Sequence, residues 1–343
     1  MRTGNRPYLI LGAIALILLG CQEAMQSQSN KIWVEQGRLQ TQQGPYFIKA
    51  VCYHPVAKGQ TQRSFDRLTE DLALMKEAGI NSIRVYEPIT SLEVLDEIYE
   101  AGIRVIVSFG YNQQGRYDLR SETYLDYITK FKDHPAILFW ELGNEYNYHP
   151  EWFGGSLDLW YSTLEKAIQA IHELDPDHPV ASAHGEVPTP EVLNRLSALD
   201  LWGLNVYRWD ESYKALEDFD QSSEKAVYFS ELGADSYMTV SKLGYEQGQN
   251  QRAQADALSN MLSEILTSDT RAAGVAIFSF TDGWWKAGAP EIQDIGGWAP
   301  GSSGVPYDGT ANEEYWGIVD IDRNIKEVYN VIQSFFKSDQ GPQ

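Results

Sequence analysis

The chain has 343 residues, a formal net charge of −21 and two cysteines. Lys and Arg total 27 against 48 Asp and Glu, so we expect no nucleic-acid partner, because such binding depends on neutralising phosphates. Two cysteines cannot build a disulfide scaffold, and an apolar content of 43% excludes a wholly disordered chain. Aromatic residues make up 12% of the chain, which suits a neutral, flat-faced ligand such as a sugar better than an anionic one.

The first twenty residues have the pattern of a secretory signal peptide. Arg2 and Arg6 form a positively charged segment ahead of an uncharged stretch, residues 7–20, that is mostly Leu, Ile and Ala. This stretch is shorter than the roughly 20 residues that a membrane-spanning helix needs, although an uncleaved N-terminal anchor is the alternative interpretation. Residues 18–21 (LLGC) resemble the bacterial lipobox, in which the cysteine becomes the lipidated first residue.

We therefore expect a lipoprotein signal peptide over 1–20, a polar tether over 21–31 and one catalytic domain over 32–338. Cys21 would carry the lipid and attach the protein to a membrane, which leaves Cys52 without an intrachain disulfide partner. This organisation predicts a secreted bacterial lipoprotein of the cell envelope, either periplasmic or anchored in the outer membrane.

The remaining chain alternates between strand-like and helix-like segments. Residues 32–50 predict a hairpin with turns at Gly37 and at Gly44-Pro45. Short apolar segments predict eight interior strands, over residues 47–53, 80–86, 103–109, 136–142, 179–183, 201–207, 227–232 and 274–280. Apolar residues at helical spacing predict helices within residues 65–75, 92–98, 124–131, 160–171, 192–199, 258–266 and 325–336.

This alternation favours a (β/α)8 TIM barrel with a short N-terminal β-hairpin and a long loop after strand eight. A doubly wound open sheet is the alternative. However, neither G-x-G-x-x-G nor G-x-x-x-x-G-K-[ST], the nucleotide-binding signatures of such sheets, follows a strand. Because a barrel places its active site at the C-terminal ends of its strands, the search for catalytic residues narrows to a few positions.

Two of these strand ends carry carboxylates. Glu145 follows the fourth strand, and Glu231 lies at the end of the seventh. Cleavage of a glycosidic bond requires two opposed carboxyl groups, one that protonates the leaving oxygen and one that attacks the anomeric carbon or activates water. Either Glu alone could instead belong to a buried ion pair, but two on nearly opposite strands favour catalysis.

The segments around these residues resemble the clan A retaining glycoside hydrolases. The resemblance covers roughly residues 45–337. Residues 140–145 (WELGNE) are similar to the catalytic barrels of β-glucuronidases and β-galactosidases, of the glycoside hydrolase family 2 type. Residues 229–231 (FSE) are similar to the nucleophile segment of cell-wall β-1,3-glucanosyltransferases. Further matching strand ends are residues 83–86 (IRVY) and 203–207 (GLNVY).

The resemblance implies roles for individual residues. Glu231 would be the nucleophile and Glu145 the acid/base, with carboxyl groups about 5–5.5 Å apart and net retention of configuration. Arg84 and Tyr207 would lie beside Glu231 and favour its charged form. Proximity to ionised Glu231 would raise the pKa of Glu145, and Asn144 would hold the sugar 2-hydroxyl.

Several nearby side chains are further candidates. Glu141 competes for the acid role, but it lies four residues earlier on the strand and is interpreted as structural. His54, after strand one, is expected to contact a sugar hydroxyl, with an ordinary surface-loop histidine as the alternative. Tyr86 and Tyr111, with Asn112, are expected to line the same site.

The loop after strand eight, residues 281–319, is the most distinctive segment. It contains six aromatic residues among many glycines, and a loop of this length is usually functional. Trp284 and Trp285 are the candidates for stacking on pyranose rings, whereas Trp316 is expected to pack the loop against the barrel. Phe278 aligns with a Trp of strand eight in the β-glucuronidase-like barrels, which is where this sequence departs from them.

These observations predict a retaining β-glycosidase that cleaves a neutral oligo- or polysaccharide, most simply a β-glucan. A transglycosylase that uses the same residues, a binding barrel without catalysis and an envelope scaffold remain alternatives. No cofactor is expected, because two carboxylates suffice for the hydrolysis. No metal site is expected either, since the six histidines show no compelling ligand spacing.

Overall fold

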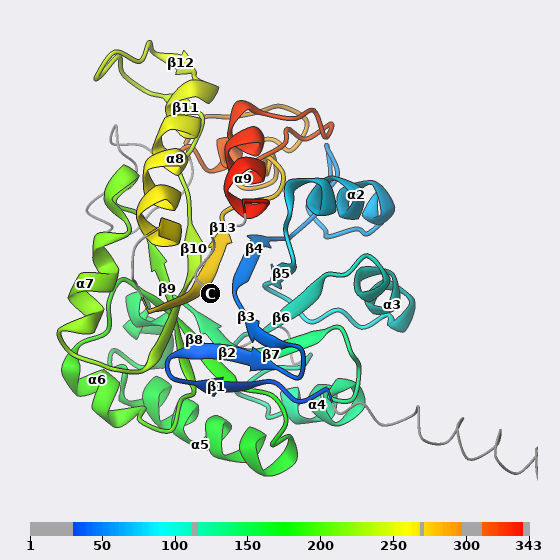
Figure 1. Ribbon diagram of the computed structural model, residues 1–343, viewed down its shortest axis with the longest axis vertical. Helices are drawn as coiled ribbons and strands as arrows, with labels where there is room; N and C mark the ends of the chain where they lie inside the picture. Colours follow the sequence, from blue (N-terminus) through cyan, green and yellow to red (C-terminus); the bar gives the residue numbers. More distant parts are fainter. Residues whose placement is uncertain (1–29, 112–115, 268–270, 297–310, 339–343) are drawn as a thin grey trace, which may run out of the picture.

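The computed structural model describes residues 30–111, 116–267, 271–296 and 311–338. At its centre, eight parallel strands close into a barrel in the order β10-β13-β4-β5-β6-β7-β8-β9 (Figure 1). The predicted (β/α)8 fold is therefore confirmed, and the open sheet is excluded. The barrel strands are β4 (Ile48–Cys52), β5 (Ser82–Val85), β6 (Arg104–Phe109), β7 (Ile137–Asn144), β8 (Val180–Gly185), β9 (Leu201–Val206), β10 (Ala226–Leu232) and β13 (Ala272–Ile277).

A helix follows each barrel strand and packs on the outside of the barrel (Figure 1). Only α7 was not predicted, because it is short and four of its seven residues are charged, although Leu216 and Phe219 are buried. The helices are α2 (Leu68–Ala78), α3 (Leu92–Glu100), α4 (Tyr124–Phe131), α5 (Asp158–Leu174), α6 (Pro190–Arg195), α7 (Lys214–Asp220), α8 (Gln251–Thr267) and α9 (Glu327–Phe336).

Local sequence explains where several helices begin and end. Ser91 caps α3 by accepting the Val94 N–H over 3.2 Å, and Thr189 caps α6 in front of a proline at the first helical position. Gly79 ends α2 with φ 80°, a left-handed conformation that favours glycine. These residues turn the chain from each helix toward the next strand.

The N-terminal hairpin is part of a small antiparallel sheet, β1 (Trp33–Glu35), β2 (Arg38–Thr41) and β3 (Gly44–Tyr46). Gly37 lies in the first turn as predicted, but the second turn lies at residues 42–43, and Gly44-Pro45 begin β3. Leu39 is fully buried and packs with residues at the starts of barrel strands, such as Ile48 and Leu201. The sheet therefore covers the N-terminal end of the barrel, whereas the active site is expected at the C-terminal end.

Two barrel strands are irregular close to their C-terminal ends. The pairing of β7 with β8 shifts between Leu142 and Asn144, and the pairing of β10 with β9 shifts between Phe229 and Glu231. Such irregularities change the direction in which a side chain points. They occur at the two strand ends that carry the predicted carboxylates.

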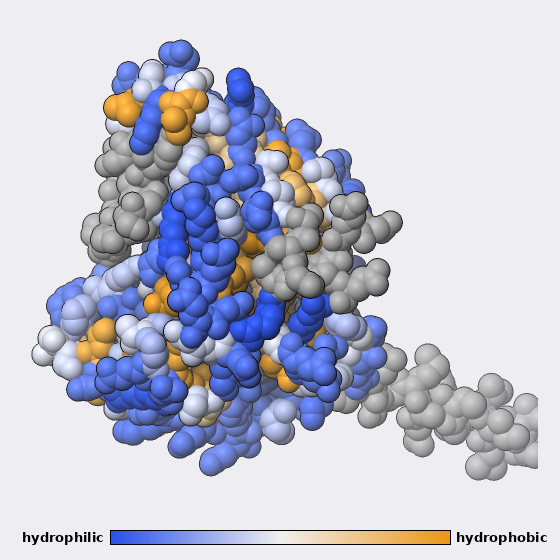
Figure 2. Space-filling view, turned by 60° about the vertical axis from the view of Figure 1, so that its left-hand side comes forward, coloured by the Kyte–Doolittle hydropathy of each residue, from blue (hydrophilic) through white to orange (hydrophobic). Residues whose placement is uncertain are grey.

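The loops beyond the C-terminal strand ends contain the short elements η1 (Tyr146–Tyr148), η2 (Pro150–Phe153), η3 (Trp209–Glu211), β11 (Tyr237–Met238), β12 (Gly248–Gln249) and η4 (Glu313–Tyr315). Figure 2 shows a mostly hydrophilic surface, with apolar side chains at the projecting end of the segment between β11 and β12, where Leu243 is 75% exposed. This surface agrees with the large excess of acidic residues.

The predicted signal peptide, Cys21 and most of the tether lie outside the described residues. Within the described ranges, every helix is too short or too polar to cross a lipid bilayer.

Candidate active site

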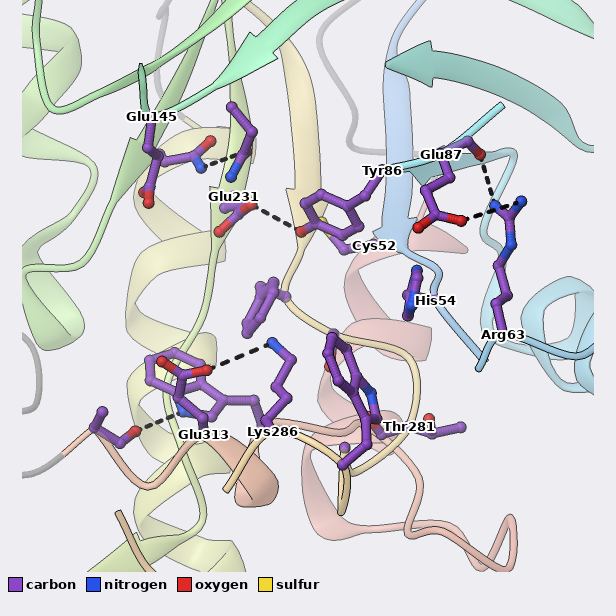
Figure 3. Close-up of a pocket in the computed structure, with 18 of the residues that line it drawn as sticks. Cys52, His54, Arg63, Tyr86, Glu87, Glu145, Glu231, Thr281, Lys286 and Glu313 are labelled. Atoms are coloured by element: carbon purple, nitrogen blue, oxygen red, sulfur yellow. Dashed lines mark hydrogen bonds and ion pairs between the residues drawn. The ribbon is translucent and has the colours of Figure 1, made fainter. Parts of the chain in front are cut away.

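A cavity of about 520 Å³ opens where the barrel strands end. Its walls come from the ends of β4, β7, β9 and β10 and from the loop after β13 (Figure 3). The structure thereby brings together residues that are far apart in the sequence. Seven of the predicted site residues line this cavity, namely His54, Tyr86, Asn144, Glu145, Tyr207, Glu231 and Trp285.

Glu231 is almost fully buried and accepts three hydrogen bonds. Its Oε1 accepts from Nη1 of Arg84 over 2.8 Å and from the hydroxyl of Tyr86 over 2.7 Å. Its Oε2 accepts from the hydroxyl of Tyr207 over 2.5 Å. Burial and then neighbouring groups that include Glu231 raise the pKa of both phenols, so both remain donors. The donors orient the carboxylate and compensate its negative charge.

Arg84 connects this carboxylate to a second layer of polar groups in the barrel interior. Its side chain is fully buried, and it donates to Glu141 over 2.7 Å and to Asn144 over 2.8 Å. Glu141 also accepts from Ser108 over 2.5 Å and from Tyr228. Glu141 is thus surrounded by donors and has no exposed surface, and it is not among the described residues that line the cavity.

Glu145 follows β7 directly and has a left-handed backbone with φ 57°, an uncommon conformation for a residue other than glycine. Burial, and next the Glu231 carboxylate, raise the pKa of Glu145 to about 8. A carboxyl group with this pKa holds its proton at neutral pH and can donate it. The direction of the shift at Glu145 is the one that its proximity to Glu231 was expected to cause.

Asn144 is held by two donors at its side-chain oxygen. Arg84 donates over 2.8 Å, and Nδ2 of Asn205 donates over 3.1 Å. Asn205 is fixed in turn, because Ser230 donates to its oxygen over 2.6 Å. With its oxygen occupied, Asn144 retains its amide N–H groups as donors for a ligand. Asn205 also lines the cavity. The sequence analysis gave it no role of its own and included it only within residues 203–207, a strand end that resembles the clan A enzymes.

His54 lies in the cavity wall beside the loop after β13. Its ring centroid is 5.1 Å from that of Trp285. Burial, followed by the positive charges of Arg63 and Lys286, lowers the pKa of His54 to about 4. His54 is therefore neutral at pH 7, and among the described residues its Nδ1 has no hydrogen-bond partner. The alternative of an ordinary surface-loop histidine is inconsistent with this position.

Two predicted lining residues lie elsewhere. Tyr111 packs against Phe153 at 4.9 Å between centroids, and Trp284 lies under the ammonium of Lys58 at 4.1 Å. Neither is among the described residues that line the cavity. Trp284 and Trp285 lie in a turn that the Lys286 N–H closes by donating to the Gly283 carbonyl over 3.0 Å, and of the two only Trp285 is among the described lining residues.

Trp316 packs the loop against the barrel, as predicted, but it also lines the cavity. Its ring meets Tyr207 edge-on at 5.1 Å and Phe278 at 5.7 Å. Phe278, Trp285 and Trp316 therefore add to the aromatic wall that Tyr86 and Tyr207 begin. Asn112 and the loop residues Trp298 and Tyr307 lie outside the described residues.

Several lining residues were missed by the sequence prediction. Arg63 follows β4, and Tyr148 belongs to η1, whereas Lys286 and Glu313 come from the two ends of the loop after β13. Lys286 follows the predicted Trp285 directly. The other three stand in polar segments without periodicity, so no local pattern distinguishes them from ordinary surface residues.

Four histidines outside the cavity each pair with a carboxylate. Within the described ranges, no group of three or more His, Cys, Asp or Glu residues is placed to hold a metal ion. His178 pairs with Asp175 at 2.9 Å in the connection between α5 and β8, whereas His172 of α5 pairs with Asp200, just before β9, at 2.8 Å.

The amino-acid sequence matches one family model and one curated protein. The family model for the TIM barrel domain of glycosyl hydrolases family 2 matches residues 33–239. The curated mannan endo-1,4-β-mannosidase F of Aspergillus clavatus is 40% identical over 55 residues, which are 16% of this chain and 12% of that protein.

Solved structures share the fold. The β-glucuronidase of Faecalibacterium prausnitzii superposes with a TM-score of 0.69 and 19% identity, covering 91% of this chain and 52% of that one. The family 2 β-galacturonidase of Eisenbergiella tayi gives a TM-score of 0.64 and 21% identity, covering 90% and 54% respectively. This chain spans about half the length of these proteins, and at these identities the likeness shows the fold alone.

Proposed function

The chain belongs to the TIM barrel domain family of the family 2 glycosyl hydrolases, and on this premise we propose that it is a retaining β-glycosidase acting on a neutral glycan, specifically a β-glucan. The observation that carries the proposal is the pairing of two carboxyl groups in one cavity. Glu231 is compensated by three donors, whereas the pKa of Glu145 is raised to about 8.

In the first step, a carboxylate oxygen of Glu231 forms a bond to the anomeric carbon while the glycosidic C–O bond breaks. Glu145 gives its proton to the departing oxygen, so the leaving sugar is released as an alcohol. The negative charge of Glu231 is consumed in the resulting ester. Arg84 and Tyr207 hold the attacking carboxylate in place, and Asn144 can donate to the sugar 2-hydroxyl.

In the second step, water or another sugar hydroxyl attacks the anomeric carbon. Glu145, now ionised, takes the proton of the attacking hydroxyl, and the ester bond to Glu231 breaks. Because Glu231 regains its charge, the pKa of Glu145 rises again and the enzyme returns to its starting state. Two inversions at one carbon give net retention of configuration.

The charges of the described lining residues support a neutral sugar. Arg63 lies 3.8 Å from the Glu87 carboxylate, and Lys286 lies 3.9 Å from that of Glu313. Arg84, beneath the cavity, pairs with Glu231 and Glu141. Each cation therefore already faces an acid. The similar proteins, by their names, act on mannan, glucuronides and galacturonides, so the family alone does not decide the sugar.

We also propose that the protein is a lipoprotein of the cell envelope, attached through Cys21. The N-terminal pattern of residues 1–21 supports this. In a bacterial host supplied with labelled palmitate, the wild-type protein should acquire label, and Cys21→Ser should not. Equal labelling of the two would contradict the proposal.

The catalytic proposal is tested by incubating the domain with β-glucan, β-mannan and β-galactan oligosaccharides and with β-glucuronides. Mass spectrometry then gives product lengths, and proton NMR gives the configuration of the first product. We expect shortened β-glucan products with β configuration, and products longer than the donor would establish transglycosylation. First products of α configuration, or no cleavage of any glycoside, would contradict the proposal.

A further inference from the structure

Two charged side chains that the proposed reaction does not use face the cavity from opposite arms of the loop after β13. Lys286 lies on the arm that leaves the strand, and Glu313 opens η4 on the arm that returns. In Figure 3 both lie across the cavity from Glu145 and Glu231. Their Nζ and Oε2 atoms are 3.9 Å apart.

The two arms are fixed relative to each other by the neighbouring residue. Glu314 is fully buried, and its carboxylate accepts the backbone N–H of Ala287 over 3.0 Å and that of Asp294 over 2.5 Å. The backbone segments that carry Lys286 and Glu313 are therefore held close to each other. Charged pairs on freely moving surface chains are not held in this way.

The separation is longer than a direct hydrogen bond, which spans about 2.7–3.2 Å. An oxygen atom placed beside both groups can make a normal hydrogen bond to each. Such an oxygen must accept from the ammonium and donate to the carboxylate. A hydroxyl group does both, whereas a carboxylate oxygen only accepts.

The position of the pair indicates which part of a sugar it would meet. The ammonium of Lys286 lies 4.1 Å from the centroid of Phe278. Phe278 packs edge-on against Tyr207 at 6.1 Å, and Tyr207 is bonded to Glu231. A continuous run of side chains thus connects the pair to Glu231. A pyranose held with its anomeric carbon at Glu231 and its ring along this run would present to the pair the hydroxyls remote from the anomeric carbon.

We infer that Lys286 and Glu313 are a specificity-determining pair that bridges one hydroxyl of a neutral sugar and rejects a uronic acid at the same place. The inference rests on the proposed function and names the group that selects its substrate. A sugar carboxylate in place of the bridged hydroxyl has no proton for Glu313 and adds a second negative charge beside it. The barrels of similar fold that act on uronides would differ from this one at that point.

The test compares Lys286→Met, Glu313→Gln and the double variant with wild type. Lys58→Met is the matched control, because Lys58 also lies over a tryptophan ring but outside the cavity lining. For each protein, kcat/KM and the binding constant by calorimetry are measured on the best neutral oligosaccharide and on the equivalent uronide. Thermal unfolding confirms that each variant is folded.

Each single variant should lose about 10- to 100-fold in kcat/KM on the neutral sugar, the range for a hydrogen bond to a charged group. The double variant should lose little more than the worse single variant, because both remove the same bridge. Glu313→Gln should raise the uronide-to-neutral activity ratio, and Lys58→Met should match wild type.

Additive losses, unchanged kcat/KM in both single variants or a wild-type preference for the uronide would overturn the inference, while the glycosidase proposal would stand. Weakened binding in the single variants without any cleavage by wild type would instead overturn the proposed function and leave the pair in place. A lack of binding to every neutral oligosaccharide would overturn both.

Discussion

Arg84 places its guanidinium 2.8 Å from Oε1 of Glu231 while both side chains are almost completely removed from water. The same guanidinium bonds Glu141 and Asn144. Arg84, a residue of β5, thus connects the cavity residues Glu231 and Asn144 to Glu141 in the barrel interior. Because Arg84 neutralises two carboxylates at once, it contributes to stability as well as to the geometry of the site.

Replacing Arg84 with Met should destabilise the fold by about 3–5 kcal/mol, because it leaves buried carboxylates without their cation. Urea unfolding monitored by tryptophan fluorescence measures the loss. Arg67→Met is the control, since Arg67 forms an exposed pair with Glu70 and such pairs contribute at most about 1 kcal/mol. Equal losses in the two variants would show that the interior network is not the source of the stability.

Glu145, directly after β7, and Glu141, within β7, should respond differently to replacement by Gln. Glu145→Gln should lower kcat/KM by about 10²–10⁴-fold for poor leaving groups and much less for activated aryl glycosides, which need no proton. Added azide should restore turnover of the aryl glycosides, because azide attacks the anomeric carbon without a general base.

Glu141→Gln should mainly lower the denaturation midpoint, with a similar fractional loss of activity for poor and good leaving groups. Its carboxylate accepts from Arg84 and Ser108 and is not among the described cavity-lining residues. The assignments would be contradicted if kcat/KM of Glu141→Gln, rather than that of Glu145→Gln, depended on the leaving group or if azide restored its activity. Glu141 would then be the acid/base and Glu145 the structural residue.

The raised pKa of Glu145 predicts the pH dependence of activity. Burial and Glu231 raise this pKa to about 8, and the general acid is active only when protonated. kcat/KM on substrates with poor leaving groups should therefore fall as the pH rises through about 8. The decline should disappear in Glu145→Gln, which has no proton to lose. A decline that begins near pH 5 would contradict the assignment.

The same shift predicts the pH dependence of stability. The pKa of Glu145 rises from the ordinary 4.5 to about 8 in the folded protein, so between these values the native state keeps a proton that the unfolded state has lost. The stability that Glu145 contributes therefore falls as the pH rises through this window. Thermal melts at pH 4.5 and pH 8 should show Glu145→Gln gaining in Tm relative to wild type at the higher pH.

Gly143 precedes the Asn144-Glu145 pair and should not tolerate a side chain. It has φ 72°, and a Cβ atom there would lie 2.6 Å from the ring of Trp160. Gly143→Ala should lower both Tm and activity, because the strained backbone displaces the strand end. Gly102→Ala, also at positive φ but with open space around its Cβ, should affect stability alone.

The barrel could be predicted because its strands are short apolar segments of the kind buried on both faces. The 136–142 segment became β7, whose observed end places Glu145 directly beyond the strand. Glu231 could be predicted because it lies at the end of such a strand, whereas the place of Arg84 beside it was implied by the resemblance to clan A glycoside hydrolases. Their mutual contacts follow from barrel closure.

The loop contributions to the site could not be predicted in this way. Lys286 and Glu313 are 27 positions apart and meet where the buried Glu314 joins the two arms of the loop. The hydrophobic periodicity of the sequence does not predict that contact. The choice between Trp284 and Trp285 likewise depends on the path of a loop backbone, and Tyr111 turned toward a neighbouring aromatic cluster instead of the cavity.

The most direct test of the central claim is the activity of Glu231→Gln on the oligosaccharide that wild type cleaves best. Circular dichroism first establishes that the variant is folded, and initial rates are then compared by mass spectrometry of the products. The account predicts a loss of about 10⁴-fold or more, because the nucleophile is removed. Turnover comparable to that of wild type would contradict it.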